Sequence, residues 1–445
     1  MQKLSDLKLK ITEEKTYYFQ LSAIVVFSAF TTLWSIAKVQ RSEYYAAIAM
    51  SMSKSVSNLF FGAIDPSGSV TLDKIPGSYW IPALFVRIFG FSTWAITVPN
   101  ALATIALVVV VAKTAKLLFG KTAALLAAAI VATTPIITAV SRSNQPQSFF
   151  LLTLSLAGLS VVKAIENLSR RHLIFAGAFI ALAFHTYMLE AWAIWPAVII
   201  AWFFTQQRTS KKILDLLIAG SVSFFLSMVW ILTVFLIPSS HRPYIGGTYH
   251  NNPFEMVFGY NGLGRFSATT SALSSSTDNP NFRSFTPPFG GTAGIDRLFN
   301  NQVTGQISWL IPTAIISAVI LFVLKKKVPL TVFFTVWFVL FFAMFSTVAG
   351  IHQFYTSALA LPVSALVGAA IYATFKEEKK IAFFIILFSA TFSAILFSRK
   401  YPSYMTWAPK VQAIALLFGI LLLIFQSMTI SRFLLPTVVL VSLLL

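Results

Sequence analysis

The chain has 445 residues, of which 57% are hydrophobic and 11% are charged. A soluble domain ordinarily carries about 25% charged residues, so this charge is too sparse to cover a water-soluble globule. Apolar runs of about 18–25 residues recur along the sequence, and each can cross a hydrocarbon core about 30 Å thick as a helix. The pattern therefore predicts an all-α, polytopic transmembrane bundle of about 11–13 spans.

The formal net charge of +19 could suggest a nucleic-acid-binding protein. Most of this excess lies in short basic clusters between apolar runs, such as residues 325–327, which is the pattern of cytoplasmic loops in membrane proteins. We therefore expect a lipid bilayer around the chain and no nucleic-acid partner. Cysteine is absent, which excludes a disulfide framework, a thiol nucleophile and a thiolate metal site.

The N-terminal residues 1–16 are lysine-rich and are predicted to form a cytoplasmic tail. The first apolar run, about residues 17–37, is long enough for a retained anchor, and it opens a transmembrane domain over residues 17–445. The alternation of basic turns places two long loops, residues 38–91 and 239–306, on the outer face. The last apolar run, residues 433–445, ends abruptly, which leaves open a truncation before a C-terminal soluble domain.

The first of these loops holds two half-polar stretches, residues 43–61 and 78–89, which we expect to be interfacial or re-entrant helices. Asp73 and Lys74 lie between them, and Glu43 precedes two tyrosines. A carboxylate there could act as a general base on an incoming hydroxyl, and a lysine could hold a phosphate. The alternative is that Asp73 and Lys74 cap the following helix or lie among lipid headgroups.

Two further polar positions interrupt the apolar pattern. Glu190 lies close to an apolar run, where an acid is costly and usually has a functional role or a partner. His352 is one of five histidines, and taken alone it is better explained by a turn or helix cap than by a ligand. The histidines are dispersed, and no metalloprotease, P-loop or dinucleotide motif is present, so the sequence predicts no dedicated metal site.

Several short segments together resemble one family. They are residues 43–47 (EYYAA), 73–76 (DKIP), 86–90 (VRIFG), 258–265 (FGYNGLGR) and 352–356 (HQFYT). Over nearly its whole length the chain resembles polytopic GT-C type glycosyltransferases, specifically bacterial relatives of protein O-mannosyltransferases and aminoarabinose transferases. The mannosyltransferase-like branch of Gram-positive bacteria is the most similar of these.

The resemblance implies a membrane glycosyltransferase that moves a sugar from a polyprenyl-phosphate donor to a protein, wall-polymer or glycolipid acceptor on the extracytoplasmic side of the plasma membrane. It makes Asp73 the preferred base, with Glu43 as the competitor, and no cofactor is certain, although a divalent cation remains open. The residues that it assigns to donor phosphate or sugar binding, or to ordering the loops around the cavity, are Lys74, Arg87, Arg142, Asn144, Glu190, Arg242, Tyr260, Asn261, Arg265 and His352.

The chain departs from the family pattern at three positions. Gln147 stands where relatives commonly carry an acid, Tyr187 where they often carry lysine, and Ile75 where they have proline. Glu190 falls where relatives often have glutamine, and it could compensate for the acid lost at Gln147. Two other functions stay open: a transporter or flippase of lipid-linked substrates, and an inactive GT-C relative that acts as a scaffold.

Overall fold

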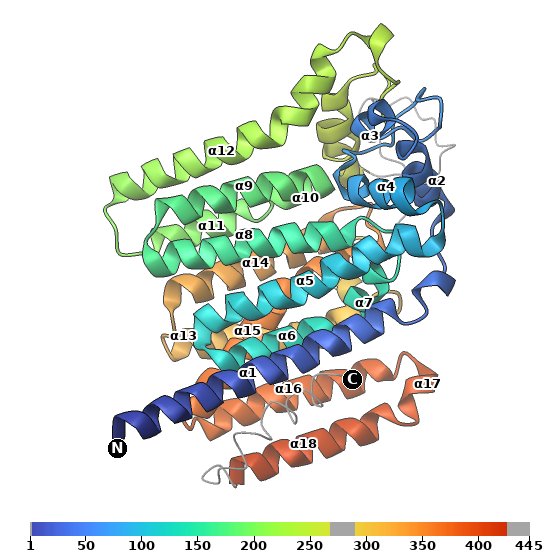
Figure 1. Cartoon of the computed structure of the whole chain (residues 1–445). Helices are drawn as coiled ribbons and strands as arrows, with labels where there is room; N and C mark the ends of the chain where they lie inside the picture. The colour runs from blue at the N-terminus through green and yellow to red at the C-terminus, as the bar shows by residue number, and fades with distance from the viewer. Residues whose placement is uncertain (1, 268–289, 425–445) are drawn as a thin grey trace.

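The computed structural model describes residues 2–267 and 290–424, and its long helices run side by side as one bundle (Figure 1). Among these described residues, eight helices have the length and apolar composition of membrane spans, or nine if the bent pair α6 and α7 counts as one. The predicted all-α transmembrane bundle is therefore confirmed. Its longer elements are α1 (Gln2–Leu33), α5 (Thr93–Phe119), α6 (Lys121–Thr133), α7 (Pro135–Ser141), α8 (Gln147–Asn167), α9 (Arg170–Tyr187), α12 (Thr209–Leu236), α13 (Leu310–Val323), α14 (Val328–Thr347), α15 (Ala360–Lys376), α16 (Lys380–Ser398) and α18 (Ala408–Ile424).

This count is lower than the expected 11–13 because several apolar runs form helices that are short or broken. Helix α9 has 18 residues, about 27 Å of helix, and begins with two arginines. The next run is divided into α10 (Leu189–Trp192) and α11 (Trp195–Phe203), and α18 has 17 residues. The expected terminal run, residues 433–445, lies outside the described residues. Hydropathy therefore located the apolar segments, and several of them form shorter or broken helices in the described part of the chain.

The helices bury one continuous apolar core and expose apolar side chains outward. Helix α12 packs along α9, where the backbone at Gly177 comes so close that an added Cβ would lie 2.4 Å from the carbonyl oxygen of Ala219. On its outer side α12 exposes large apolar residues, including Phe225 and Leu236. Exposed apolar surface of this extent is expected where a helix faces lipid rather than water.

Short helices gather at one end of the bundle (Figure 1). They are α2 (Glu43–Met52), α3 (Val56–Phe61) and α4 (Gly77–Phe89), which confirms the helices predicted in residues 43–61 and 78–89. Ser55 caps α3 by accepting a hydrogen bond from the Asn58 N–H at 3.0 Å. The Ser78 hydroxyl lies within 3.1 Å of the carbonyls of Pro146 and Thr186, so the start of α4 is joined to α8 and α9.

The chain after α12 returns to this same end in short 3-10 and π turns rather than α-helices. In the described part they are η2 (Ser239–His241), η3 (Glu255–Tyr260), η4 (Leu263–Ser267), η6 (Arg297–Phe299), η7 (Thr304–Ser308) and η8 (Gln353–Leu359). Two of them, η3 and η7, are π-helices. A π turn is rare and often accompanies a functional site, so both draw attention to the residues that they carry.

Candidate active site

A cavity of about 1000 Å³ opens at the end of the bundle where α2, α3 and α4 gather. It is lined by segments far apart in sequence: α2, the connection between α3 and α4, the junction of α9 with α10, the η3–η4 loop and the connection before η8. The polar and tyrosine side chains that these segments contribute are Tyr44, Tyr45, Asp73, Lys74, Tyr187, Glu190, Tyr260, Asn261, Arg265, His352 and Tyr355. We refer to it as the main cavity.

Asp73 and Lys74 form an ion pair in the wall of the main cavity. The Lys74 Nζ lies 2.8 Å from the Asp73 Oδ1, and the two side chains are 12% and 24% exposed, respectively. The same ammonium lies 5.8 Å from the centre of the Tyr45 ring, which stacks on the buried Tyr79. The lysine is thus held between a carboxylate and an aromatic face, and the pair remains open to a ligand in the cavity.

Asn261 joins this pair to Arg265. The Asn261 Nδ2 donates a hydrogen bond to the Asp73 carbonyl at 2.6 Å, and the Arg265 Nη2 donates to the Asn261 Oδ1 at 2.8 Å. The Arg265 guanidinium also lies 5.6 Å from the centre of the Tyr260 ring. The asparagine–glycine–leucine–glycine run, which carried the most specific part of the resemblance, therefore brings a second cation to the acid.

A glycine pair lets the loop after α12 approach Asp73 closely. The Thr71 N–H donates to the Tyr244 carbonyl at 2.8 Å, and a Cβ on Gly246 would lie only 2.3 Å from the Thr71 carbonyl oxygen. Gly247 has a φ of +73°, and its backbone packs against Asp73 and Tyr260. Larger residues at these two positions would push the loop away from the acid.

The backbone turns sharply between α9 and α10, beside Tyr187 and Glu190. Met188 has a φ of +52°, a conformation that is strained for a residue with a side chain and that is often found near functional sites. Tyr187 then packs edge-to-face on Tyr355, with ring centres 5.4 Å apart, and Glu190 reaches the cavity half-buried. This turn therefore directs Glu190, which the sequence singled out beside an apolar run, into the cavity.

The charges in the cavity influence one another. Burial raises the pKa of Asp73, but the ammonium of Lys74 and the guanidinium of Arg265 outweigh it and hold that pKa below its ordinary value. Burial lowers the pKa of Lys74, but the carboxylate of Asp73 outweighs it, so the net shift is upward. Burial, with the nearby charges of Arg265 and Lys74, lowers the pKa of His352 to about 4. At neutral pH the cavity therefore holds a carboxylate, two cations and an uncharged imidazole.

Five residues proposed from the sequence lie outside the main cavity. The Glu43 side chain is 77% exposed and pairs with Arg41 at 3.1 Å, and Arg87 is exposed near the end of α4. The Arg142 Nη1 donates to the Thr31 carbonyl at 2.8 Å, which ties the end of α7 to α1.

The other two polar candidates outside the cavity organise loops. The Asn144 Oδ1 accepts a hydrogen bond from the Ser42 N–H at 2.9 Å, and the Asn144 Nδ2 donates to the Ser42 carbonyl at 2.8 Å. Asn144 thereby fixes the start of α2. Arg242 donates to the Asn251 Oδ1 and carbonyl oxygen, both at 2.7 Å, and thereby orders the loop that carries the glycine pair. These hydrogen bonds use the polar groups of both side chains to hold neighbouring loop residues, so neither side chain is directed at a ligand.

Of the tyrosines that line the main cavity, only Tyr260 was predicted from the sequence as a site residue. Tyr44 and Tyr45 follow Glu43 directly, and Tyr355 lies inside the segment that resembles the family near His352. Aromatic residues near a membrane surface are ordinarily explained by an interfacial belt, so these tyrosines did not stand out in the sequence as ligand-binding residues. Their place beside polar motifs, rather than at the ends of apolar runs, was the available clue.

Gln147 stands where the resemblance led us to expect an acid, and in the described part of the chain its surroundings show neither a group of metal ligands nor a replacement carboxylate. In the described ranges, no three side chains of His, Cys, Asp or Glu gather in a group suited to a metal ion. The Gln147 amide is buried at the start of α8, and within the described part of the chain neither of its polar atoms has a hydrogen-bond partner. Glu190 lies in the main cavity, but Gln147 is not among the residues that line it.

Comparison with solved structures defines the class of protein. The structure of ArnT from Cupriavidus metallidurans bound to undecaprenyl phosphate matches 96% of this chain and 77% of that chain, with a TM-score of 0.61 and 14% identity. The archaeal oligosaccharyltransferase AglB from Archaeoglobus fulgidus, in complex with an inhibitory peptide and a dolichol-phosphate, matches 89% of this chain and 56% of that one, with a TM-score of 0.55 and 13% identity. The chain is a multi-pass membrane protein with the GT-C fold.

Sequence comparison confirms the resemblance and makes it more specific. Residues 73–232 match the model of the dolichyl-phosphate-mannose-protein mannosyltransferase family. The mannosyltransferase-like protein YycA of Bacillus subtilis (strain 168) is 29% identical over 439 residues, which cover 80% of this chain and 64% of the relative. YkcB of the same organism is 36% identical over 253 residues, 56% of this chain and 35% of the relative. Residues 73–232 are thus similar to a mannosyltransferase family, and the chain spans less than two thirds of the length of these relatives.

Proposed function

We propose that this chain is a glycosyltransferase that moves a sugar from a polyprenyl-phosphate donor to an acceptor hydroxyl. The observation that carries the proposal is the Asp73–Lys74 ion pair, with Arg265 linked to it through Asn261, in a cavity of about 1000 Å³. The cavity is large enough for a sugar and part of a lipid chain. Beside the Asp73 carboxylate it holds two cations, and an acid with cations is what sugar transfer from a phosphate requires.

In the proposed reaction the acceptor oxygen attacks the anomeric carbon of the donor sugar. The bond between that carbon and the phosphate oxygen breaks, and polyprenyl phosphate leaves with the electron pair. Asp73 takes the proton of the acceptor hydroxyl, while Arg265 and Lys74 stabilise the negative charge that grows on the phosphate. The solved relatives with undecaprenyl phosphate or dolichol-phosphate support this donor class, because the present cavity also offers cations for a lipid phosphate.

The donor sugar is proposed to be a mannose-like hexose, in view of the relatives, and the acceptor a protein, wall polymer or glycolipid. The polar groups lie at one end of the bundle, and we assign that end to the extracytoplasmic face of the plasma membrane. A transporter of lipid-linked substrates would need polar groups along its spans and an opening at either face in turn. The concentration of charged cavity residues at one end favours transfer over transport.

The test follows loss of radiolabel from a panel of polyprenyl-phosphate sugars incubated with the purified full chain. Asp73→Asn is expected to lower the transfer rate by about 10²–10⁴-fold, because the amide cannot accept the proton. Glu43→Gln is the matched control and should transfer at the wild-type rate, since Glu43 is exposed outside the cavity. Equal turnover by wild type and Asp73→Asn would remove Asp73 from the mechanism.

Two other outcomes would favour the remaining functions. Saturable donor binding without turnover in the wild type would indicate an inactive relative that binds lipid-linked sugar. Movement of the intact lipid-linked sugar between leaflets of a vesicle, with no loss of label from the lipid, would indicate a flippase. Thermal unfolding of each variant is measured alongside, so that misfolding is not mistaken for lost chemistry.

A further inference from the structure

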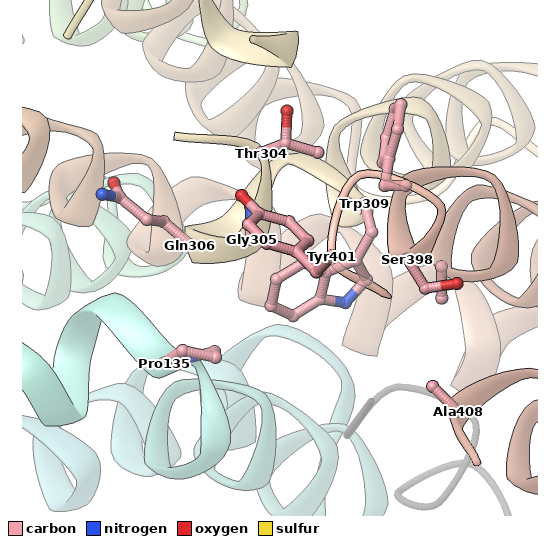
Figure 2. Close-up of a pocket in the computed structure, with 10 residues that line it drawn as sticks. Pro135, Thr304, Gly305, Gln306, Trp309, Ser398, Tyr401 and Ala408 are labelled. Atoms are coloured by element: carbon pink, nitrogen blue, oxygen red, sulfur yellow. The ribbon is translucent and has the colours of Figure 1, made fainter. Parts of the chain in front are cut away.

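A second cavity of about 310 Å³ lies between η7, the end of α16 and the start of α18 (Figure 2). The end of α16 and the start of α18 lie at the same end of the bundle as α4 (Figure 1). Its wall includes Gly305 and Gln306 of η7, Trp309, and Tyr401 from the chain that follows α16. Phe397, Ala394 and Pro135 add apolar surface. None of these residues lines the main cavity, so this second cavity is a separate site.

The π-helix η7 builds one wall of the second cavity, as the π-helix η3 brings Tyr260 to the main cavity. The Gly305 N–H donates to the Tyr401 hydroxyl at 2.9 Å, and that hydroxyl donates to the Asn301 carbonyl at 2.9 Å. A Cβ on Gly305 would lie 3.0 Å from the Tyr401 hydroxyl oxygen. The glycine and both hydrogen bonds therefore hold the Tyr401 ring as a fixed aromatic wall.

Trp309 lines this space and carries a buried hydrogen-bond donor that is unused within the described part of the chain. Its side chain is only 5% exposed, and among the described residues its indole N–H has no hydrogen-bond partner. Trp337 also has a buried indole N–H without a partner in the described ranges, but it faces a space of only about 20 Å³, about the size of one water. Trp309 therefore combines an unsatisfied buried donor with room for a ligand that could accept its hydrogen bond.

The chemistry of the wall selects a neutral ligand. Among the described residues that line the second cavity there is no Asp, Glu, Lys, Arg or His, so none of them would compensate a phosphate or carboxylate. Aromatic faces together with an indole N–H and the Gln306 amide suit a ring with apolar C–H edges and hydroxyl or ring oxygens. A pyranose ring has these features, and a volume of about 310 Å³ holds one such unit.

The second cavity adjoins the main cavity through η8. The Thr356 hydroxyl donates to the Gln306 Oε1 at 2.6 Å, and the preceding residue, Tyr355, lines the main cavity. We propose that the second cavity binds one neutral sugar unit, and that this unit belongs to a glycan-bearing acceptor whose reacting hydroxyl enters the main cavity. The assignment of the unit to the acceptor rests on the glycosyltransferase function proposed above, whereas the binding of a neutral sugar does not.

The experiment is a saturation-transfer NMR titration of the full chain in lipid nanodiscs with the methyl glycosides of glucose, galactose and mannose. We expect saturable binding of at least one glycoside to the wild type. Trp309→Phe keeps the aromatic ring but removes the donor, and should raise the dissociation constant by about two- to tenfold. The control Trp337→Phe removes an equally buried donor away from the second cavity and should leave the dissociation constant unchanged.

A second variant guards against a folding artefact. Ala394→Leu adds side-chain volume inside the second cavity and should also weaken binding, with no loss of the indole. The proposal is overturned if no glycoside binds the wild type, or if Trp309→Phe and Ala394→Leu both bind as tightly as the wild type. A lipid chain as the natural occupant would give the first of these results.

The same titration on Asp73→Asn separates this inference from the proposed function. Normal glycoside binding by Asp73→Asn, with loss of transfer, supports both the sugar site and the role of the acid. Loss of transfer without any glycoside binding in the wild type would retain the proposed function and overturn the sugar site. Binding that depends on Trp309 in a protein without transferase activity would retain the sugar site and refute its assignment to the acceptor of a transfer reaction.

Discussion

Asp73 is ionised because the positive charges of Lys74 and Arg265 outweigh the effect of burial on its pKa. Single substitutions should therefore change its ionisation. With the pKa of Asp73 held below its ordinary value, the carboxylate stays charged throughout the neutral range, and the acid limb of the activity should lie below about pH 4. The same shift makes the folded state more stable above the ordinary pKa of an aspartate. That stability is lost as the pH falls through the lower pKa of the folded protein.

Replacing Lys74 should therefore move the acid limb of the reaction. In Lys74→Met the burial of Asp73 is opposed only by Arg265, so the pKa of Asp73 rises and kcat/KM begins to fall at a higher pH than in the wild type. The donor KM should also increase, because the donor phosphate loses one cation. The measurement is kcat/KM against pH for wild type and Lys74→Met.

Lys74→Arg is the control for charge in that series. It keeps the cation and should retain the acid limb of the wild type, even if its different shape slows the reaction. Identical pH profiles for the wild type and Lys74→Met would show that Lys74 does not set the ionisation of Asp73. His352 has a pKa of about 4, which Lys74 helps to lower, so it also titrates in the acid range and the series is repeated in a His352→Gln background.

Sequence reasoning predicted a large part of the main cavity but could not separate ligand-facing residues from those that bind backbone. Asp73, Lys74, Asn261 and Arg265 are brought together, as the resemblance implied. Asn144 has the same polar character at the end of an apolar run, yet its amide is used to hold the backbone of Ser42. Such residues are alike in a sequence, and only the fold determines what each one contacts.

At the scale of elements, a single arginine fixes the end of α14 beside the main cavity. Arg297 is 1% exposed and donates to the carbonyl oxygens of Phe345, Val348 and Ala349 just at and beyond the helix end. The segment that follows is tied to the η3–η4 loop, because the Gly350 N–H donates to the Arg265 carbonyl at 3.2 Å. A cation at a helix C-terminus is favourable, and here it also satisfies carbonyls that lack helical partners.

Arg297→Met should destabilise the folded protein by about 2–4 kcal/mol, because several buried carbonyl groups lose their donor. Since the same segment leads to His352, we also expect a higher donor KM in this variant. Thermal unfolding and steady-state kinetics of the full chain measure both effects. Arg87→Met is the control, since Arg87 is exposed near the end of α4 and its loss should change neither value. An unfolding temperature equal to that of the wild type would contradict the role of Arg297.

The ends of the helices show what hydropathy alone could not predict, namely where an apolar run bends or breaks. The apolar run over the residues of α6 and α7 does not form one straight helix, because the chain bends by 61° between Thr133 and Pro135. Proline lacks the N–H that would continue the helix, so the break has a local cause, yet many apolar helices absorb a proline without such a bend. Pro99 within α5 and Pro82 within α4 are examples in this chain. Apolar content alone does not distinguish the two outcomes.

At the scale of the whole molecule, charge is divided between the two ends of the bundle. Basic residues in the turns opposite the main cavity pair with acids there: Lys121 with Glu14 at 3.0 Å, and Lys327 with Glu166 at 2.9 Å. The remaining excess of Lys and Arg in these short turns predicts that this end faces the cytoplasm, by the positive-inside rule. The main and second cavities would then both face outward, where a lipid-linked sugar and an external acceptor can meet.

The absence of cysteine from the chain makes this orientation directly testable. Ser210 and Ser240 lie near the two ends of α12, and both are exposed, so Ser210→Cys and Ser240→Cys form a matched pair. A membrane-impermeant maleimide should label Ser240→Cys in intact cells and Ser210→Cys only after the membrane is permeabilised. The opposite pattern would turn the cavities toward the cytoplasm. A cytoplasmic site would have access to nucleotide sugars, so the argument for a lipid-linked donor on the outer face would then fail, even though Asp73, Lys74 and Arg265 would be arranged as before.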